Sequence, residues 1–300
     1  MTWEYDQHFH HPQTPLLLTS VVRLDENRIP ASNNHLHLHL STHSRPSWES
    51  RQVTFFAPLS IRNISTMSSN NSKSSKPRLL CLHGACSNNE ITMFQTAGLA
   101  LDQRFDCVYL HGPHIVAKSA VGLDQLSDGP FYAWADPTKS LYEREEMWES
   151  SLDYIAEYCR KSNNTTFVGI FGFSQGAAII TNFCHPNVWK NKYNMKACPW
   201  EFAILACGAG GHCITGVSRD STTTTTKIEI PSFHIYGKND RQLNDSKIIS
   251  EYWSHAQRCA HTHSRGHEID IQMHAREKEM MKKLNSFYDE CTSMNNNNNK

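Results

Sequence analysis

Ser174 lies in the string Gly172-Phe-Ser-Gln-Gly176, directly after the apolar residues 166–171 and before the helix-forming residues 177–180. This is the G-x-S-x-G pattern of a nucleophile elbow, a sharp turn that joins a strand to a helix. The two glycines supply the small residues that such a turn requires. The pattern predicts an exposed Ser174 hydroxyl beside a helix N-terminus, whose free N–H groups favour negative charge.

A serine hydroxyl is a poor nucleophile until a histidine accepts its proton, and a carboxylate must orient that histidine. The candidate acid is Asp240, which ends the string Gly237-Lys-Asn-Asp240 after the strand-like residues 231–236. Open α/β sheets place functional groups at the carboxyl ends of their strands. Asp245, at the start of the next helix-like stretch, is the alternative acid.

The candidate base is His267, because it follows Gly266 in a predicted loop before the last helix, where an imidazole can reach the nucleophile. His263 is the alternative and falls in the predicted final strand. The histidines that follow Asp240 are His255, His261, His263, His267 and His274.

Acyl transfer also requires N–H donors for the oxyanion that forms on the carbonyl. One donor is expected from the residue after the nucleophile, Gln175, and a second from the loop after an earlier strand. The string Leu82-His83-Gly84-Ala85 predicts that Ala85, or alternatively Cys86, supplies the second N–H.

Short apolar runs alternate with helix-like stretches along residues 76–290, which predicts an α/β domain with a parallel sheet. Residues 166–171 are apolar on both faces, as expected for a strand covered by helices on both sides. Residues 114–140 show no clear period and are expected to form a loop or lid. The predicted strands are 78–82, 105–110, 166–171, 201–207 and 231–236, and the predicted helices are 90–101, 143–159, 243–258 and 274–288.

The composition divides the chain into three parts. Residues 1–75 are rich in His, Ser, Asn and Thr and are expected to form a disordered, low-complexity extension. The predicted catalytic domain spans 76–290, and the Asn-rich residues 291–300 are expected to be a disordered tail.

The charge balance excludes several classes of partner. Lys plus Arg equals Asp plus Glu at 29 each, so no basic field is expected to bind nucleic acid. Apolar residues nowhere run long enough for a membrane span, and the N-terminus lacks the features of a secretory signal. With the ten cysteines read as reduced thiols, the cytoplasm is the expected compartment, with the nucleus as an alternative.

Six strings together resemble the serine-hydrolase family of α/β-hydrolase fold that includes human ovarian-cancer-associated protein 2 and the yeast "family of serine hydrolases" esterases. They are Leu80-Cys-Leu-His-Gly84, Tyr109-Leu-His-Gly-Pro113, Tyr132-Ala-Trp134, Gly172-Phe-Ser-Gln-Gly176, Gly237-Lys-Asn-Asp240 and Gly266-His267. The resemblance covers about residues 76–290. One departure is Arg241-Gln-Leu-Asn after Asp240, where the family often has an aliphatic residue and a proline.

The resemblance implies an α/β-hydrolase fold, with a mostly parallel central sheet and helices on both faces. It implies hydrolysis of a small ester or thioester through an acyl-enzyme, with Ser174, Asp240 and His267 at the triad positions and no metal or organic cofactor. His83, Tyr132 and Trp134 are candidate substrate-binding residues, although the last two fit a packed aromatic cluster equally well. The alternative function is a catalytically inactive domain that binds a ligand or serves as a scaffold. A peptidase or lipase on the same fold is a further alternative.

Overall fold

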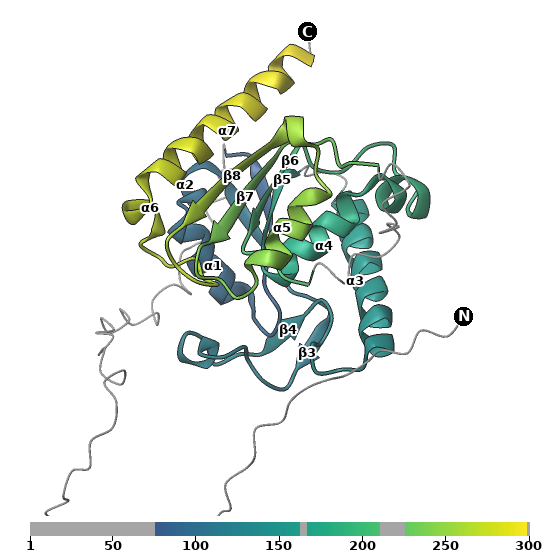
Figure 1. Ribbon diagram of the computed structural model, residues 1–300. Coiled ribbons are helices and arrows are strands. Elements are labelled where there is room, and N and C mark those ends of the chain that lie inside the picture. Colours follow the sequence, from purple (N-terminus) through teal and green to yellow (C-terminus); the bar gives the residue numbers. More distant parts are fainter. Residues whose placement is uncertain (1–75, 163–166, 211–225, 299–300) are drawn as a thin grey trace, which may run out of the picture. The chain divides into compact units, whose positions relative to one another are not determined.

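The computed structural model describes residues 76–162, 167–210 and 226–298, in which strands and helices alternate (Figure 1). The expected N-terminal extension, residues 1–75, lies outside these residues. The strands are β1 (Arg78–Leu82), β2 (Asp106–Leu110), β3 (His114–Val116), β4 (Phe131–Ala133), β5 (Phe167–Phe173), β6 (Phe202–Ala206), β7 (Ser232–Gly237) and β8 (Arg258–His263). The helices are α1 (Asn89–Gly98), α2 (Leu101–Arg104), α3 (Leu141–Lys161), α4 (Gln175–Cys184), α5 (Leu243–Glu251), α6 (Met273–Arg276) and α7 (Lys278–Asn298).

Six strands form the central sheet in the order β2-β1-β5-β6-β7-β8, and every neighbouring pair is parallel. The carboxyl ends of these strands therefore meet at one edge of the sheet. Strand β5 lies inside the sheet, and all its residues except Val168 are buried. This sheet confirms the prediction of an α/β-hydrolase fold.

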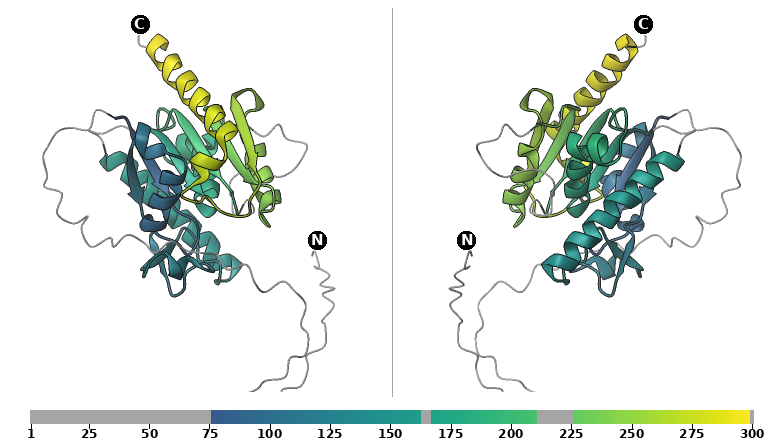
Figure 2. Two further views of the ribbon diagram at one scale, coloured as in Figure 1. Left: turned by 90° about the vertical axis from the view of Figure 1, so that its left-hand side faces the viewer. Right: turned by 90° about the vertical axis from the view of Figure 1, so that its right-hand side faces the viewer.

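Helices cover both faces of the sheet (Figures 1 and 2). One buried cluster joins the sheet to α3, α4 and α5, and the other joins it to α2, α6 and α7. Adjacent residues of β5 point to opposite faces, since Ile170 belongs to the first cluster and Phe171 to the second. The apolar character of β5 on both faces follows from this arrangement.

Residues 114–140 contain the antiparallel pair β3 and β4, which forms a separate two-stranded sheet. Two main-chain hydrogen bonds between Ser87 and Tyr132, at 3.1 and 2.7 Å, join β4 to the loop after β1. The segment expected to be a loop or lid therefore contains a β-hairpin that is attached beside the carboxyl edge of the main sheet.

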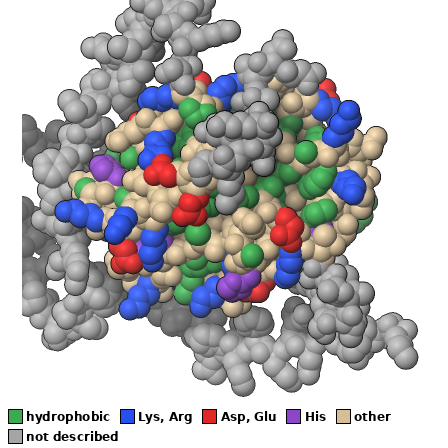
Figure 3. Space-filling view, turned by 90° about the horizontal axis from the view of Figure 1, so that it is seen from above, with side chains coloured by type: hydrophobic (Ala, Val, Ile, Leu, Met, Phe, Trp, Pro, Cys, Tyr) green, Lys and Arg blue, Asp and Glu red, His purple; other side chains and the backbone are tan. Residues whose placement is uncertain are grey.

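At the C-terminus, α7 continues to Asn298, beyond the predicted domain boundary at residue 290. None of the helices within the described ranges is both long and apolar enough to cross a membrane. On the face of the molecule shown in Figure 3, Lys and Arg side chains are interspersed with Asp and Glu side chains. Charges of one sign do not gather on that face.

Candidate active site

The nucleophile elbow lies between β5 and α4, at the carboxyl edge of the sheet. Ser174 has φ 54° and ψ −118° and directly precedes the first residue of α4. A Cβ on Gly172 would lie 2.7 Å from the main chain of Gly176, and a Cβ on Gly176 would lie 2.7 Å from the carbonyl oxygens of Leu82 and His83. Both positions require glycine because strand, helix and neighbouring loop approach one another so closely.

The loop after β1 lies directly against the nucleophile. A Cβ on Gly84 would lie 3.1 Å from the Ser174 Cβ, so the next residues of this loop also lie near Ser174. Ala85 and Gln175 line the same pocket as Ser174, whereas Cys86 is not among the lining residues. The two residues predicted to supply oxyanion donors are therefore placed beside the nucleophile.

His267 joins Ser174 to Asp240 through two hydrogen bonds. Its Nδ1 donates to Asp240 Oδ2 at 2.9 Å, and its Nε2 accepts from Ser174 Oγ at 2.9 Å. The Asp240 side chain is fully buried and also accepts from the main-chain N–H of Gln242 at 2.7 Å. The imidazole is 32% exposed and faces the pocket. The carboxylate thus fixes the tautomer in which Nε2 is free to accept a proton.

The two alternative residues, Asp245 and His263, have other partners. Asp245 lines the pocket, but its Oδ2 accepts from the main-chain N–H of Gly210 at 3.0 Å. His263, at the end of β8, is buried, and its Nε2 lies 3.7 Å from Cys207 Sγ. Burial lowers the pKa of His263. In this geometry Asp240 and His267, rather than Asp245 and His263, connect with the Ser174 hydroxyl.

The Gln175 side chain has a structural role that its position in the motif does not reveal. Its Oε1 accepts from the main-chain N–H groups of Trp134 and Ala135 at 2.9 and 3.3 Å. Its Nε2 donates to the Ala135 carbonyl at 2.8 Å. The residue after the nucleophile therefore holds the segment that follows β4 against the start of α4.

The three candidate substrate-binding residues are not among the residues that line the pocket. His83 and Trp134 are fully buried, and their rings stack with centroids 5.3 Å apart. Trp134 Nε1 donates to the His83 carbonyl at 2.8 Å, and Tyr132 packs near the same imidazole. These residues form a packed cluster that supports the loop after β1, and their contact with substrate stays a prediction.

His83 is held in its neutral form. Its Nδ1 donates to the Gly84 carbonyl at 2.6 Å, and its Nε2 accepts from the Gly112 N–H at 2.8 Å. Burial lowers the pKa of His83 to about 4. An acceptor at Nε2 is possible only in the neutral imidazole, so the hydrogen bonds and the low pKa agree.

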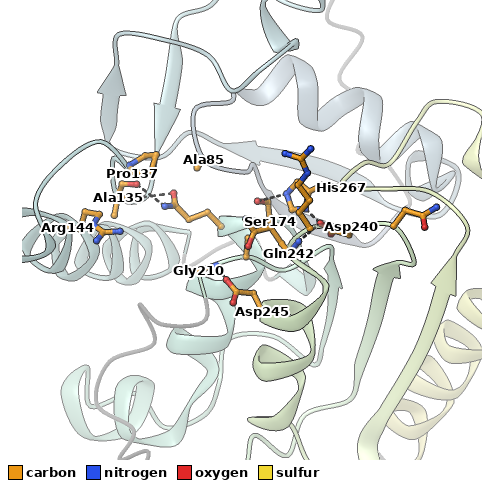
Figure 4. Close-up of a pocket in the computed structure, with 14 residues that line it drawn as sticks. Ala85, Ala135, Pro137, Arg144, Ser174, Gly210, Asp240, Gln242, Asp245 and His267 are labelled. Atoms are coloured by element: carbon orange, nitrogen blue, oxygen red, sulfur yellow. Dashed lines mark hydrogen bonds and ion pairs between the residues drawn. The ribbon is translucent and has the colours of Figure 1, made fainter. Parts of the chain in front are cut away.

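A pocket of about 530 Å³ opens at the triad (Figure 4). Its walls come from the loop after β1, the segment after β4, the start of α3, the elbow, the loops after β6 and β8, and the segment that runs from the loop after β7 into α5. The lining residues are Ala85, Ala135, Pro137, Arg144, Ser174, Gln175, Ala209, Gly210, Asn239, Asp240, Arg241, Gln242, Asp245 and His267.

In the part of the chain that the structure describes, one group has ligand atoms spaced for a metal ion: Cys207, Asp240 and His267, with these atoms within 4.8 Å of one another. Burial raises the pKa of the Cys207 thiol, and a thiol must lose its proton to bind a metal. Asp240 and His267 already form a hydrogen bond with each other. We therefore assign no metal to this group.

A Ser–His–Asp hydrogen-bond chain at the carboxyl edge of this sheet defines the class of serine hydrolases with an α/β-hydrolase fold. Comparison with known families agrees, since residues 71–278 match the family described as serine hydrolase (FSH1). The chain belongs to the serine hydrolase (FSH1) family. This confirms the family resemblance that the six strings indicate.

Three relatives illustrate this similarity. Esterase FPY3 of Fusarium mangiferae is 27% identical over 208 residues, which cover 64% of this chain and 88% of the relative. Esterase OVCA2 of Danio rerio is 26% identical, over 55% of this chain and 78% of the relative. The dihydromonacolin L-[lovastatin nonaketide synthase] thioesterase of Aspergillus terreus is 24% identical, over 57% and 76%.

Proposed function

We propose that this serine hydrolase cleaves carboxylic esters or thioesters of small molecules through a covalent acyl-enzyme at Ser174. The observation that carries the proposal is the 2.9 Å contact between Ser174 Oγ and His267 Nε2, backed by the buried Asp240 carboxylate. The relatives named esterase and thioesterase support the same substrate class.

In the first half of the reaction, Ser174 Oγ attacks the substrate carbonyl carbon while its proton moves to His267 Nε2. The Asp240 carboxylate stabilises the imidazolium that results. The carbonyl oxygen becomes an oxyanion, which the N–H groups of Ala85 and Gln175 stabilise. When the tetrahedral intermediate collapses, the alcohol or thiol leaves with the proton from His267.

In the second half, water attacks the acyl-serine carbonyl and His267 accepts a proton from that water. Collapse of the second intermediate releases the carboxylic acid and returns the proton to Ser174 Oγ. Oxygen esters and thioesters follow the same steps because both form the same acyl-enzyme.

The experiment compares the wild type with Ser174→Ala, using nitrophenyl esters of graded acyl length and a fluorophosphonate probe. We expect the probe to label only the wild type, because only an activated serine reacts with it, and turnover to fall by about 10³ or more in the variant. Circular dichroism of both proteins checks that the fold is kept. A wild type that neither reacts with the probe nor hydrolyses any ester would instead support the inactive scaffold.

A further inference from the structure

Arg144 lies on the wall of the active-site pocket with an unsatisfied guanidinium nitrogen. The residue belongs to the first turns of α3 and lines the pocket together with Ala135 and Pro137. Its side chain is partly buried, and its Nε atom is buried without a hydrogen-bond partner among the described residues. In the view of Figure 4, Arg144 and His267 lie at opposite sides of the pocket, with Ser174 beside His267.

Helix stability does not explain an arginine at this position. Cations stabilise the C-terminal turn of a helix and are unfavourable near its N-terminus, where Arg144 lies. The acidic residue beside it, Glu143, is bonded to Ser140 in the capping box. By contrast, Arg160 lies in the last turn of the same helix and is paired with Glu157 at 3.6 Å. None of the ion pairs between described residues includes Arg144, so its charge lies at the pocket wall without a counter-ion among them.

The other charged groups of the pocket leave this cation available. Asp240 accepts hydrogen bonds from His267 and from the main chain, and Asp245 accepts one from the N–H of Gly210. Arg241 also lines the pocket but is exposed to solvent. A guanidinium cannot lose its proton, and its planar fork matches the two oxygens of a carboxylate or phosphate. Buried hydrogen-bond donors in folded proteins nearly always have a partner, so a donor without one indicates a bound ligand, an ion or an ordered water molecule.

We propose that Arg144 binds an anionic group of the substrate, so that the preferred substrates are esters or thioesters carrying a carboxylate or phosphate remote from the scissile carbonyl. This inference rests on the proposed function and specifies its substrate class. The anionic group belongs either to the acyl chain or to the leaving alcohol or thiol, and both positions present the same chemistry to the guanidinium.

The test measures kcat/KM for matched pairs of substrates that differ only in charge. The acyl pair is a nitrophenyl monoester of a dicarboxylic acid and the methyl-terminated ester of equal length. The leaving-group pair is a neutral acyl thioester of a thiol with a terminal phosphate and of the same thiol without it. For each pair, the ratio of charged over neutral kcat/KM is compared between the wild type and Arg144→Gln.

We expect the wild type to favour the charged member of at least one pair, and Arg144→Gln to lower that ratio by about tenfold or more. Arg144→Lys should lower the ratio less, because the charge remains while the fork is lost. Arg160→Gln is the matched control on the same helix and should leave the ratio unchanged. The pair whose ratio falls identifies the side of the substrate that carries the anion.

Two results would overturn the inference. One is a wild type that prefers the neutral member of both pairs. The other is an equal fall in the ratio for Arg144→Gln and Arg241→Gln, because that would indicate a general electrostatic field rather than a contact with Arg144. If neutral esters are still hydrolysed and Ser174→Ala abolishes that hydrolysis, the proposed function stands although the role of Arg144 fails.

Discussion

Replacing Gln175 by methionine tests how firmly the segment after β4 is held at the active site. The change keeps the approximate shape of the side chain and removes its three hydrogen bonds to Trp134 and Ala135. A hydrogen bond contributes a net of about 0.5–1.5 kcal/mol, so the three together give about 3 kcal/mol. Gln175 is buried, so water reaches the freed N–H and C=O groups poorly and little of this loss is recovered.

Urea or thermal unfolding followed by circular dichroism measures the loss. For a domain of this size, about 3 kcal/mol corresponds to a fall in melting temperature of about 6–12 °C. Gln95→Met is the matched control, because Gln95 is also buried but its Oε1 has no hydrogen-bond partner among the described residues. We expect the control to change the free energy of unfolding by less than about 1 kcal/mol.

Equal losses in the free energy of unfolding for Gln175→Met and Gln95→Met would contradict this prediction. That result would mean that the segment after β4 is held by packing of its aromatic side chains rather than by the amide of Gln175. A fall in melting temperature with an unchanged kcat would separate stability from catalysis, since it would show that the N–H of Gln175 keeps its place without the side-chain bonds.

Four further predictions concern the same elements. His267→Ala should lower kcat by about as much as Ser174→Ala, and the double variant should cost little more, because the triad acts as a unit; additive losses in steady-state kinetics would contradict this. Ser174→Gly should be more stable than Ser174→Ala by about 1 kcal/mol in urea unfolding, because glycine adopts φ 54° without strain. Gly176→Ala should lower the free energy of unfolding by about 3 kcal/mol or more, because its Cβ would lie 2.7 Å from two carbonyl oxygens; a wild-type melting temperature would refute that. The pKa of His83 is about 4 in the folded state and 6.5 in the unfolded state, so the unfolded state binds more protons between these two pH values. The free energy of unfolding should therefore fall by about 3 kcal/mol as the pH decreases from 6.5 toward 4. His83→Asn should lose less stability over this range.

The sequence predicts the nucleophile elbow because the residues that this turn requires all lie within a few positions of Ser174. The two glycines flank Ser174 at fixed spacing, and the residues on either side show strand and helix character directly. The family strings also place Asp240 after a predicted strand and His267 in the predicted loop before the last helix. Whether His263 or His267 reaches the nucleophile depends on how the end of β8 and the following loop pass Ser174, which lies far away in the sequence.

The sequence does not predict the features of the site that depend on contacts between distant segments. The pattern of residues 143–159 predicts α3 but does not show that Arg144 faces a pocket formed by residues from six other segments. The amide of Gln175 has no local partner, because its hydrogen bonds reach Trp134 and Ala135 in another element. For Trp134, residue type alone fits packing and ligand binding equally well, and the fold shows that this side chain and His83 are both buried.

The backbone at Ser174 bears on the choice between a hydrolase and an inactive scaffold. A non-glycine residue at φ 54° and ψ −118° costs on the order of 1–3 kcal/mol. The surrounding structure holds it there, because the Ser174 N–H donates to the Ala206 carbonyl at 2.9 Å and the Ser174 carbonyl accepts from the Ala209 N–H at 3.1 Å. A binding domain gains nothing from a strained serine, since glycine would fit this turn without cost. A hydrolase gains a hydroxyl that lines the pocket and lies 2.9 Å from an imidazole nitrogen, although Ser174 as a whole is buried, so the strain favours catalysis.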